Sequence, residues 1–255
     1  MWIDLHCHIL PGVDDGSRSI EESLEMANIA ASFGTDTIVC TNHANIPRQY
    51  ENYESGYLRK SFERLCKEVE SKRIPIKLIR GNEIFVTDDI RRVLTEKKVI
   101  PIGSSKYYLC EFSFDANPDY ISEMLYGMLS DGYHPVLAHP ERYFCVQEYP
   151  EFVFKWVRAG ILIQVNKGSL LGKFSKHVEK AAWTLFDHGL ITCIASDAHS
   201  SEYRTPSMRE IAGLFRDSDL EDAMHILMHH NPKRILEGKK IDNSNIIPFE
   251  KKGWY

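Results

Sequence analysis

Two histidines near the start of the chain have the spacing of a metal site. The first seventeen residues read MWIDLHCHILPGVDDGS. The bulky apolar residues before His6 predict a short buried strand, and residues two apart on a strand point to the same side. His6 and His8 can therefore present both imidazoles to one point. A single His-x-His pair is short enough to arise without a ligand, so the remainder of the chain has to decide.

Polar or ionisable residues also follow the other predicted strands. Apolar, β-branched segments predict strands at 37–41, 76–79, 107–110, 135–138, 161–165 and 191–195, after the one at the N-terminus. With one aspartate from the first loop, the candidate ligands are His6, His8, Asp15, His43, Glu83, Glu111, His139, Asp197 and His199. All carry an imidazole or a carboxylate, a set that suits Mn²⁺, Zn²⁺ or Fe²⁺ and lacks the thiolates of a structural zinc site. Any one member could instead be structural, Glu111 as a helix cap and His43 as a loop histidine, but chance placement of all of them at strand ends is improbable.

Helical patterns separate these strands. Ser19 to Glu22 has the pattern of a capping box, Gly34 is a plausible end of that helix, and Asn117-Pro118 and Tyr149-Pro150 each predict a helix start. Alternating strands and helices predict a parallel sheet. Because ionisable residues follow six of the seven strands, a closed barrel, in which all strand ends meet at one mouth, is favoured over an open sheet. We expect one (β/α)7 TIM-like barrel over residues 1–241, with the metal site at the C-terminal mouth, and a C-terminal extension over 242–255.

Composition excludes several classes of protein. The 255 residues are 43% hydrophobic and 26% charged, as in a globular protein, and a net charge of −5 without a long basic run argues against a nucleic-acid binder. No secretory signal and no membrane span is evident, so we expect a cytoplasmic protein without membrane insertion. The six cysteines are scattered, which predicts core thiols rather than disulfides. The chain has neither the Cys-x5-Arg loop of cysteine-dependent phosphatases nor a Walker A or GxGxxG loop.

The order of the motifs resembles that of a known superfamily. D-x-H-x-H stands near the N-terminus, and a histidine, G-x-E, E-F, H-P-E-R and S-D-A-H follow strands two, three, four, five and seven. This pattern resembles the PHP (polymerase and histidinol phosphatase) superfamily. Within it, the chain is most similar to the manganese-dependent protein-tyrosine phosphatases of the CpsB/YwqE type, which act on bacterial tyrosine kinases that control capsule and exopolysaccharide synthesis. The resemblance extends from Met1 to about Ile241.

The resemblance implies a distorted barrel of the PHP type with three metal ions, Mn²⁺ foremost and Fe²⁺ or Zn²⁺ as alternatives. It implies that His6, His8, Glu83 and Asp197 hold the first ion, that Glu83 bridges to a second ion held by Glu111 and His139, and that Asp15, His43 and His199 hold the third. Arg142 and Arg204 match the phosphate-binding arginines of the family. Glu111 stands where many members of the superfamily carry histidine, and a carboxylate there is the variant of the tyrosine phosphatases, which tilts the site towards Mn²⁺.

The resemblance implies a phosphatase acting on phosphotyrosine in a protein, with a bacterial tyrosine kinase as the expected partner. The hypothesis for the chemistry is direct in-line attack by a metal-bridged hydroxide, with the arginines on the phosphate. Tyr143, Phe144 and Tyr203 could line an aromatic approach or simply pack in loops. A small-molecule phosphatase, such as histidinol-phosphate phosphatase, and a non-catalytic metal-binding docking module are the alternatives. A walled-in mouth would favour the metabolite and an open one a protein chain. Nothing in the sequence indicates an oligomeric state.

Overall fold

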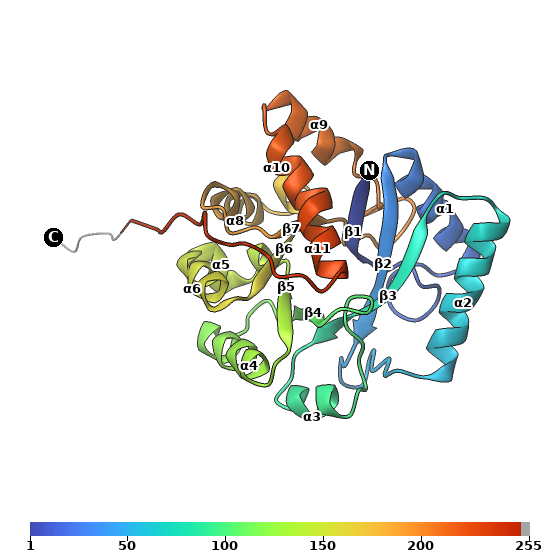
Figure 1. Ribbon diagram of the computed structural model, residues 1–255, viewed down its shortest axis with the longest axis horizontal. Coiled ribbons are helices and arrows are strands. Elements are labelled where there is room, and N and C mark those ends of the chain that lie inside the picture. Colours follow the sequence, from blue (N-terminus) through green and yellow to red (C-terminus); the bar gives the residue numbers. More distant parts are fainter. Residues whose placement is uncertain (251–255) are drawn as a thin grey trace.

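The computed structural model describes residues 1–250, and within them seven parallel strands form one sheet in chain order (Figure 1). The strands are β1 (Trp2–Cys7), β2 (Thr35–Ala44), β3 (Lys77–Phe85), β4 (Tyr107–Glu111), β5 (His134–Ala138), β6 (Leu162–Asn166) and β7 (Cys193–Ala195). At the carboxyl ends of β1 and β7, Cys7 forms a parallel bridge with Ala198, and the His8 N–H donates to the Ala198 carbonyl at 2.8 Å. The sheet is therefore a nearly closed barrel, and the predicted seven-stranded TIM-like barrel is confirmed.

Helices cover the outside of the barrel, with α1 and α2 side by side along β1 and β2, and α4, α5 and α6 on the other side (Figure 1). The first six are α1 (Ile20–Ser32), α2 (Gly56–Ser71), α3 (Ile90–Thr95), α4 (Pro118–Ser130), α5 (Phe144–Glu148) and α6 (Glu151–Ala159). The others are α7 (Lys167–Leu170), α8 (Lys176–Asp187), α9 (Arg209–Asp217), α10 (Glu221–His225) and α11 (Asn231–Leu236). A 3₁₀ turn, η1 (Pro140–Arg142), follows β5, and a π-helical turn, η2 (Ile226–His230), joins α10 to α11.

The predicted helix starts lie where local hydrogen bonding requires them. The Ser19 hydroxyl accepts from the Glu22 N–H at 3.2 Å, and the Asn117 side chain accepts from the Asp119 N–H at 2.8 Å. Glu22 does not complete the capping box on Ser19, because its carboxylate accepts from the Arg18 N–H instead. Gly34 follows α1 with a φ of +89°, a left-handed conformation that favours glycine after a helix.

The barrel interior is apolar below the mouth. One cluster joins strand residues such as Leu5, Leu109 and Val136 to Ile235 of α11 and to Ile241. Because burial of this apolar set is favourable, the lower barrel is a packed core, and polar chemistry is confined to the opposite end.

The predicted boundary at residue 241 remains a prediction. After it, the Ile247 N–H donates to the His188 carbonyl at 2.9 Å, and the Phe249 ring stacks on the His188 ring with centres 3.7 Å apart. The chain thus continues along the outside of the barrel near α8. The Gly253-Trp254-Tyr255 end lies outside the described residues.

All six cysteines are free thiols, and Cys7, Cys40, Cys110 and Cys193 are buried, as the sequence predicts. Burial raises the pKa of each of these four thiols, which keeps them protonated and poorly reactive. Within residues 1–250, no helix combines the length and the apolar character that crossing a bilayer requires.

Candidate metal centre

An irregularity in β1 aims two histidines into the mouth. Asp4 pairs with Ile38 and Cys7 with Cys40, so β1 has one residue more than β2 over this step. Such a bulge reverses the alternation of side chains and bends the strand. Leu5 therefore joins the interior core, while the Nε2 atoms of His6 and His8 lie only 3.1 Å apart at the mouth.

Glu83 is the centre of the buried part of the mouth. Its Oε2 lies 3.2 Å from Nε2 of His6, 3.2 Å from Nε2 of His8 and 3.1 Å from Nδ1 of His43. Its Oε1 lies 2.9 Å from Nε2 of His139. One carboxylate thus reaches four imidazoles that come from three different strand ends.

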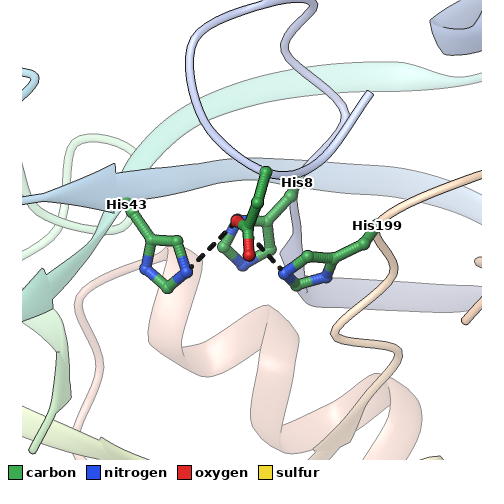
Figure 2. A group of neighbouring side chains, drawn as sticks. His8, His43 and His199 are labelled. Atoms are coloured by element: carbon green, nitrogen blue, oxygen red, sulfur yellow. Dashed lines mark ion pairs between the residues drawn. The ribbon is translucent and has the colours of Figure 1, made fainter. Parts of the chain in front are cut away.

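A second part of the mouth is more open. Oδ1 of Asp15 lies 3.5 Å from Nε2 of His43 and 3.6 Å from Nε2 of His199. Figure 2 shows the imidazoles of His8, His43 and His199 lying close together, and their ligand atoms form one group with that of Asp15. Asp15 is 51% exposed, so the centre meets solvent on this side.

Glu111 and Asp197 complete the set. Carboxylate oxygens of Glu111 lie 3.6 Å from His43 and 3.6 Å from His139. Oδ1 of Asp197 lies 3.4 Å from Nε2 of His6. The structure therefore brings together all nine side chains that the sequence singles out.

The side chains form four overlapping groups, each with ligand atoms close enough to share one ion. The groups are His8, Asp15, His43 and His199; His6, His8 and Glu83; His6, His139 and Asp197; and His43, Glu83 and Glu111. His6, His8 and His43 each belong to two groups, whereas the family resemblance assigns each to one ion. The overlap fits a cluster of neighbouring ions better than separate sites.

The donor set fits divalent cations. Two ligands about 2.1 Å from one metal ion lie about 3.0 to 3.4 Å apart in octahedral or tetrahedral geometry, close to the 2.9 to 3.6 Å contacts around Glu83 and Asp197.

Burial lowers the pKa of His199 to about 3, which leaves its ring neutral and able to ligate. Burial and the charges of Glu83 and Asp197 raise the pKa of Glu111 well above its ordinary value. Nδ1 of His43 has no hydrogen-bond partner among the described residues, although Glu83 is nearby. Unpaired imidazoles among crowded carboxylates are what a bound cation would stabilise.

Three residues that the sequence analysis missed hold the ligands in place. Oδ2 of Asp14 accepts from Nδ1 of His8 and from the His43 N–H, both at 2.9 Å. The side-chain oxygen of Gln164 accepts from Nδ1 of His6 at 2.8 Å, and Nδ2 of Asn166 donates to Asp197 at 2.6 Å. Such partners fix the ring orientation and tautomer of metal-binding histidines. Their signal in the sequence was the alternation of Gln164 and Asn166 at the end of a predicted strand, which places both on one face.

Asp14→Asn should weaken the site without unfolding the barrel. Asp14 is buried and, although burial opposes it, the contact with His8 lowers its pKa to about 2, so the native side chain is a carboxylate at neutral pH. The neutral amide of the variant removes the negative charge that raises the basicity of His8. We expect about a 10- to 100-fold loss of metal affinity, measured by competition with a chromophoric chelator. The circular dichroism spectrum should not change, and an unchanged metal affinity would show that Asp14 does not support His8.

Asp197 links the ligand cluster to both arginines. Its Oδ2 accepts a hydrogen bond from Nδ2 of Asn166 and forms an ion pair with Nη2 of Arg204. The same oxygen lies 3.5 Å from Nη1 of Arg142, while Oδ1 faces the histidines. His139, Asp197 and Arg204 have φ values of +35°, +49° and +49°, which residues with a Cβ rarely adopt. Strain of this kind is tolerated where the surrounding contacts fix the residue, as they do here. The arrangement places two permanent cations beside the cluster.

The three aromatic residues considered as a lining for the substrate approach differ in how far they are exposed. Tyr143 is fully buried, and its hydroxyl accepts from the Phe112 N–H at 3.0 Å, so a role in lining the mouth is wrong for this residue. Phe144 is 61% exposed and Tyr203 is 79% exposed. The exposure of Asp15 is typical of an open mouth rather than a closed metabolite pocket.

Comparisons with known proteins agree with this geometry. The family model described as capsular polysaccharide synthesis, CpsB/CapC, matches residues 2–237. The chain is 36% identical to the tyrosine-protein phosphatase YwqE of Bacillus subtilis, covering 94% of this chain and 93% of that protein. It is 29% identical to the tyrosine-protein phosphatase CpsB of Streptococcus agalactiae, covering 94% and 100%.

Solved structures agree as well. A crystal structure from work on YwqE of Bacillus subtilis and CpsB of Streptococcus pneumoniae, described as metal-dependent tyrosine phosphatases, matches with a TM-score of 0.87 and 30% identity, covering 98% of this chain and 100% of that one. A lactonase from Listeria monocytogenes, at a TM-score of 0.54 and 12% identity over 94% and 95% of the two chains, shares the fold alone.

Proposed function

The chain belongs to the CpsB/CapC family of capsular polysaccharide synthesis, and we propose that it is a metal-dependent protein-tyrosine phosphatase with a three-ion centre. The observation that carries the proposal is the meeting of nine imidazole and carboxylate side chains with two arginines around Asp197. Neutral imidazoles and carboxylates hold divalent cations, and guanidinium groups bind phosphate. A centre of this composition suits hydrolysis of a phosphate monoester.

The ligands would be His6, His8, Asp15, His43, Glu83, Glu111, His139, Asp197 and His199. Mn²⁺ is the cation we propose first, with Fe²⁺ or Zn²⁺ as alternatives, because four carboxylates make the donor set hard. When bound, such ions supply hydroxide at neutral pH and offset the negative charge of the phosphate oxygens. Glu83, which reaches four imidazoles, is placed to be shared between ions.

The chain's own residues would bind and orient the substrate. The guanidinium groups of Arg142 and Arg204 both pair with Oδ2 of Asp197. A phosphate bound between them would therefore contact two permanent cations that are already held in position. Asn166 in turn fixes this carboxylate. The phenol of tyrosine has a pKa of about 10, so the leaving group needs less protonation than an alkoxide, and no general acid is assigned.

The open side of the mouth favours phosphotyrosine presented by a protein. Asp15 in the centre is exposed, and so is Tyr203, which precedes Arg204 in the sequence, and this exposure gives a protein segment access. We propose a bacterial tyrosine kinase of capsule or exopolysaccharide synthesis as the partner and the cytoplasm as the location. The names of the relatives support a phosphotyrosine substrate, and the description of the family model supports a role in capsule synthesis.

Phosphate release from a phosphotyrosine peptide tests the proposal directly. The Mn²⁺-loaded protein should prefer that peptide to a matched phosphoserine peptide and to histidinol phosphate. Alkylation of the two partly exposed thiols, Cys66 and Cys145, should not reduce the rate, because no cysteine takes part. A preference for histidinol phosphate would move the function to a small-molecule phosphatase, and no release from any ester would favour the docking module.

Arg142→Lys should reduce turnover at a preserved metal centre. Lysine keeps the positive charge but loses the fork that binds two phosphate oxygens at once. We expect kcat/KM for the phosphotyrosine peptide to fall by about 10- to 100-fold, as for loss of one or two charge-assisted hydrogen bonds. Steady-state kinetics gives the rate, and metal analysis of the purified variant is the control. Wild-type kcat/KM in the variant would refute phosphate binding by Arg142.

A further inference from the structure

Two phenylalanine rings outside the ligand set lie against the Arg142 guanidinium. Cζ of Arg142 is 4.4 Å from the ring centre of Phe114 and 5.1 Å from that of Phe174. Phe114 follows β4 and Phe174 precedes α8, so segments far apart in the sequence meet at this arginine. Cation–π contacts of this length are favourable and hold a side chain that is otherwise free to change rotamer.

The two rings have different surroundings. The Phe114 ring lies edge-on to the His139 ring, with centres 6.0 Å apart, and its backbone carbonyl accepts from the Phe144 N–H at 2.8 Å. It is therefore fixed against the core of the site. Phe174 keeps 36% of its surface exposed.

Gly168, in α7, makes room for the Phe174 ring. A Cβ at this glycine would come within 3.1 Å of Cε2 of Phe174, closer than most side-chain contacts. The Lys173 N–H also donates to the Gly168 carbonyl at 2.9 Å, which ties the segment before Phe174 to α7. The Phe174 ring is thus held in a partly exposed position against Arg142, the arginine that binds phosphate in the proposed function.

We propose that Phe174 is a specificity-determining residue whose exposed face stacks on the phenyl ring of phosphotyrosine, and that Phe114 is a positioning residue for Arg142. The inference rests on the proposed function, because it places the phosphate at Arg142. Only one oxygen joins the phosphate to the phenyl ring, so that ring lies within stacking distance of a side chain that touches the guanidinium. Aromatic rings pair at centre distances of about 4.5 to 7 Å, and a phosphoserine offers no ring to pair.

Phenylphosphonate and methylphosphonate test the two roles separately. They carry the same anionic group, they resist hydrolysis, and only one has a ring. Titration calorimetry with the Mn²⁺-loaded protein should give a lower Kd for phenylphosphonate. Phe174→Leu should reduce this preference by roughly 2- to 10-fold and leave the Kd of methylphosphonate unchanged. Phe114→Leu should weaken both ligands by the same factor and leave the preference unchanged.

Two further variants are controls. Phe174→Tyr retains the ring and should retain the preference, which shows that any loss in Phe174→Leu comes from the missing ring and not from misfolding. Tyr57→Leu removes an exposed ring on α2, which is not one of the two rings that lie over Arg142, and should behave as the wild type.

Several results would overturn the inference. A wild-type protein that binds both phosphonates equally, or a Phe174→Leu variant that keeps the preference, would show that no ring stacks on Phe174. A loss of preference in Tyr50→Leu instead would place the substrate ring near His43, on which Tyr50 stacks. If the wild type releases phosphate from the phosphotyrosine peptide in these cases, only this inference fails and the proposed function stands. Absence of such release would refute the proposed function itself.

Discussion

Glu83→Gln should abolish phosphate release almost completely. The glutamine has the same shape, but its neutral amide would not supply the anionic ligand that the proposed centre requires at this position. Its NH₂ group would face imidazole nitrogens that now lie 2.9 to 3.2 Å from the carboxylate. We expect kcat/KM for a phosphotyrosine peptide to fall by at least about 10³-fold, together with a loss of bound metal. Steady-state kinetics and elemental analysis measure the two effects.

Glu54→Gln is a matched control for this variant. Its carboxylate pairs with Arg80 and Arg59 and makes no contact with the nine ligands among the described residues. It should keep wild-type turnover and metal content. Substantial activity in Glu83→Gln would mean that the buried carboxylate is structural and that the centre does not depend on it.

Removal of divalent cations should have the second large effect, on both activity and stability. In the proposed function the cations bind the folded centre and not the unfolded chain, so their loss should lower the free energy of unfolding. At a concentration of 100 times Kd this contribution is about 2.7 kcal/mol, which corresponds to a fall of roughly 5 to 10 °C in Tm for a chain of this size. Treatment with EDTA should also stop phosphate release, and added Mn²⁺ should restore both quantities. Scanning calorimetry and a phosphate assay follow them.

Arg142→Lys separates the two parts of this prediction. The variant keeps all nine ligands, so EDTA should lower its Tm as it does for the wild type, although its activity starts lower. Equal Tm values with and without EDTA in the wild type would argue against a buried cation cluster. Activity that survives EDTA would argue against a metal-dependent reaction.

Much of the fold could be predicted because the signals are local. Strands such as 107–110 and 135–138 are short apolar segments beside turn residues, and the helix caps at Ser19 and Asn117 depend on residues two or three positions away. The capping box at Ser19 was only half right, because Glu22 accepts from Arg18 instead. Whether the Glu22 carboxylate accepts from the Ser19 N–H or from the Arg18 N–H depends on the path of the loop before the helix. The capping-box pattern contains no information about that path.

The sequence by itself determined the composition of the site. The residue types at the strand ends, together with the rule that parallel strands end at one mouth, were sufficient to select eight of the nine side chains. Asp15 was added from the first loop, and the two arginines were implied by the family resemblance. The tertiary structure decided how they are held. The bulge in β1 that aims His6 and His8, the support of His6 by Gln164 and the packing of Phe114 and Phe174 on Arg142 all depend on contacts between distant segments. The choice between the two roles left open for Tyr143 was also decided by tertiary contacts, since its place in the core is fixed by Phe112 on another strand end. Residue types and periodicity are local properties of the chain, whereas register shifts and packing arise only when the barrel closes.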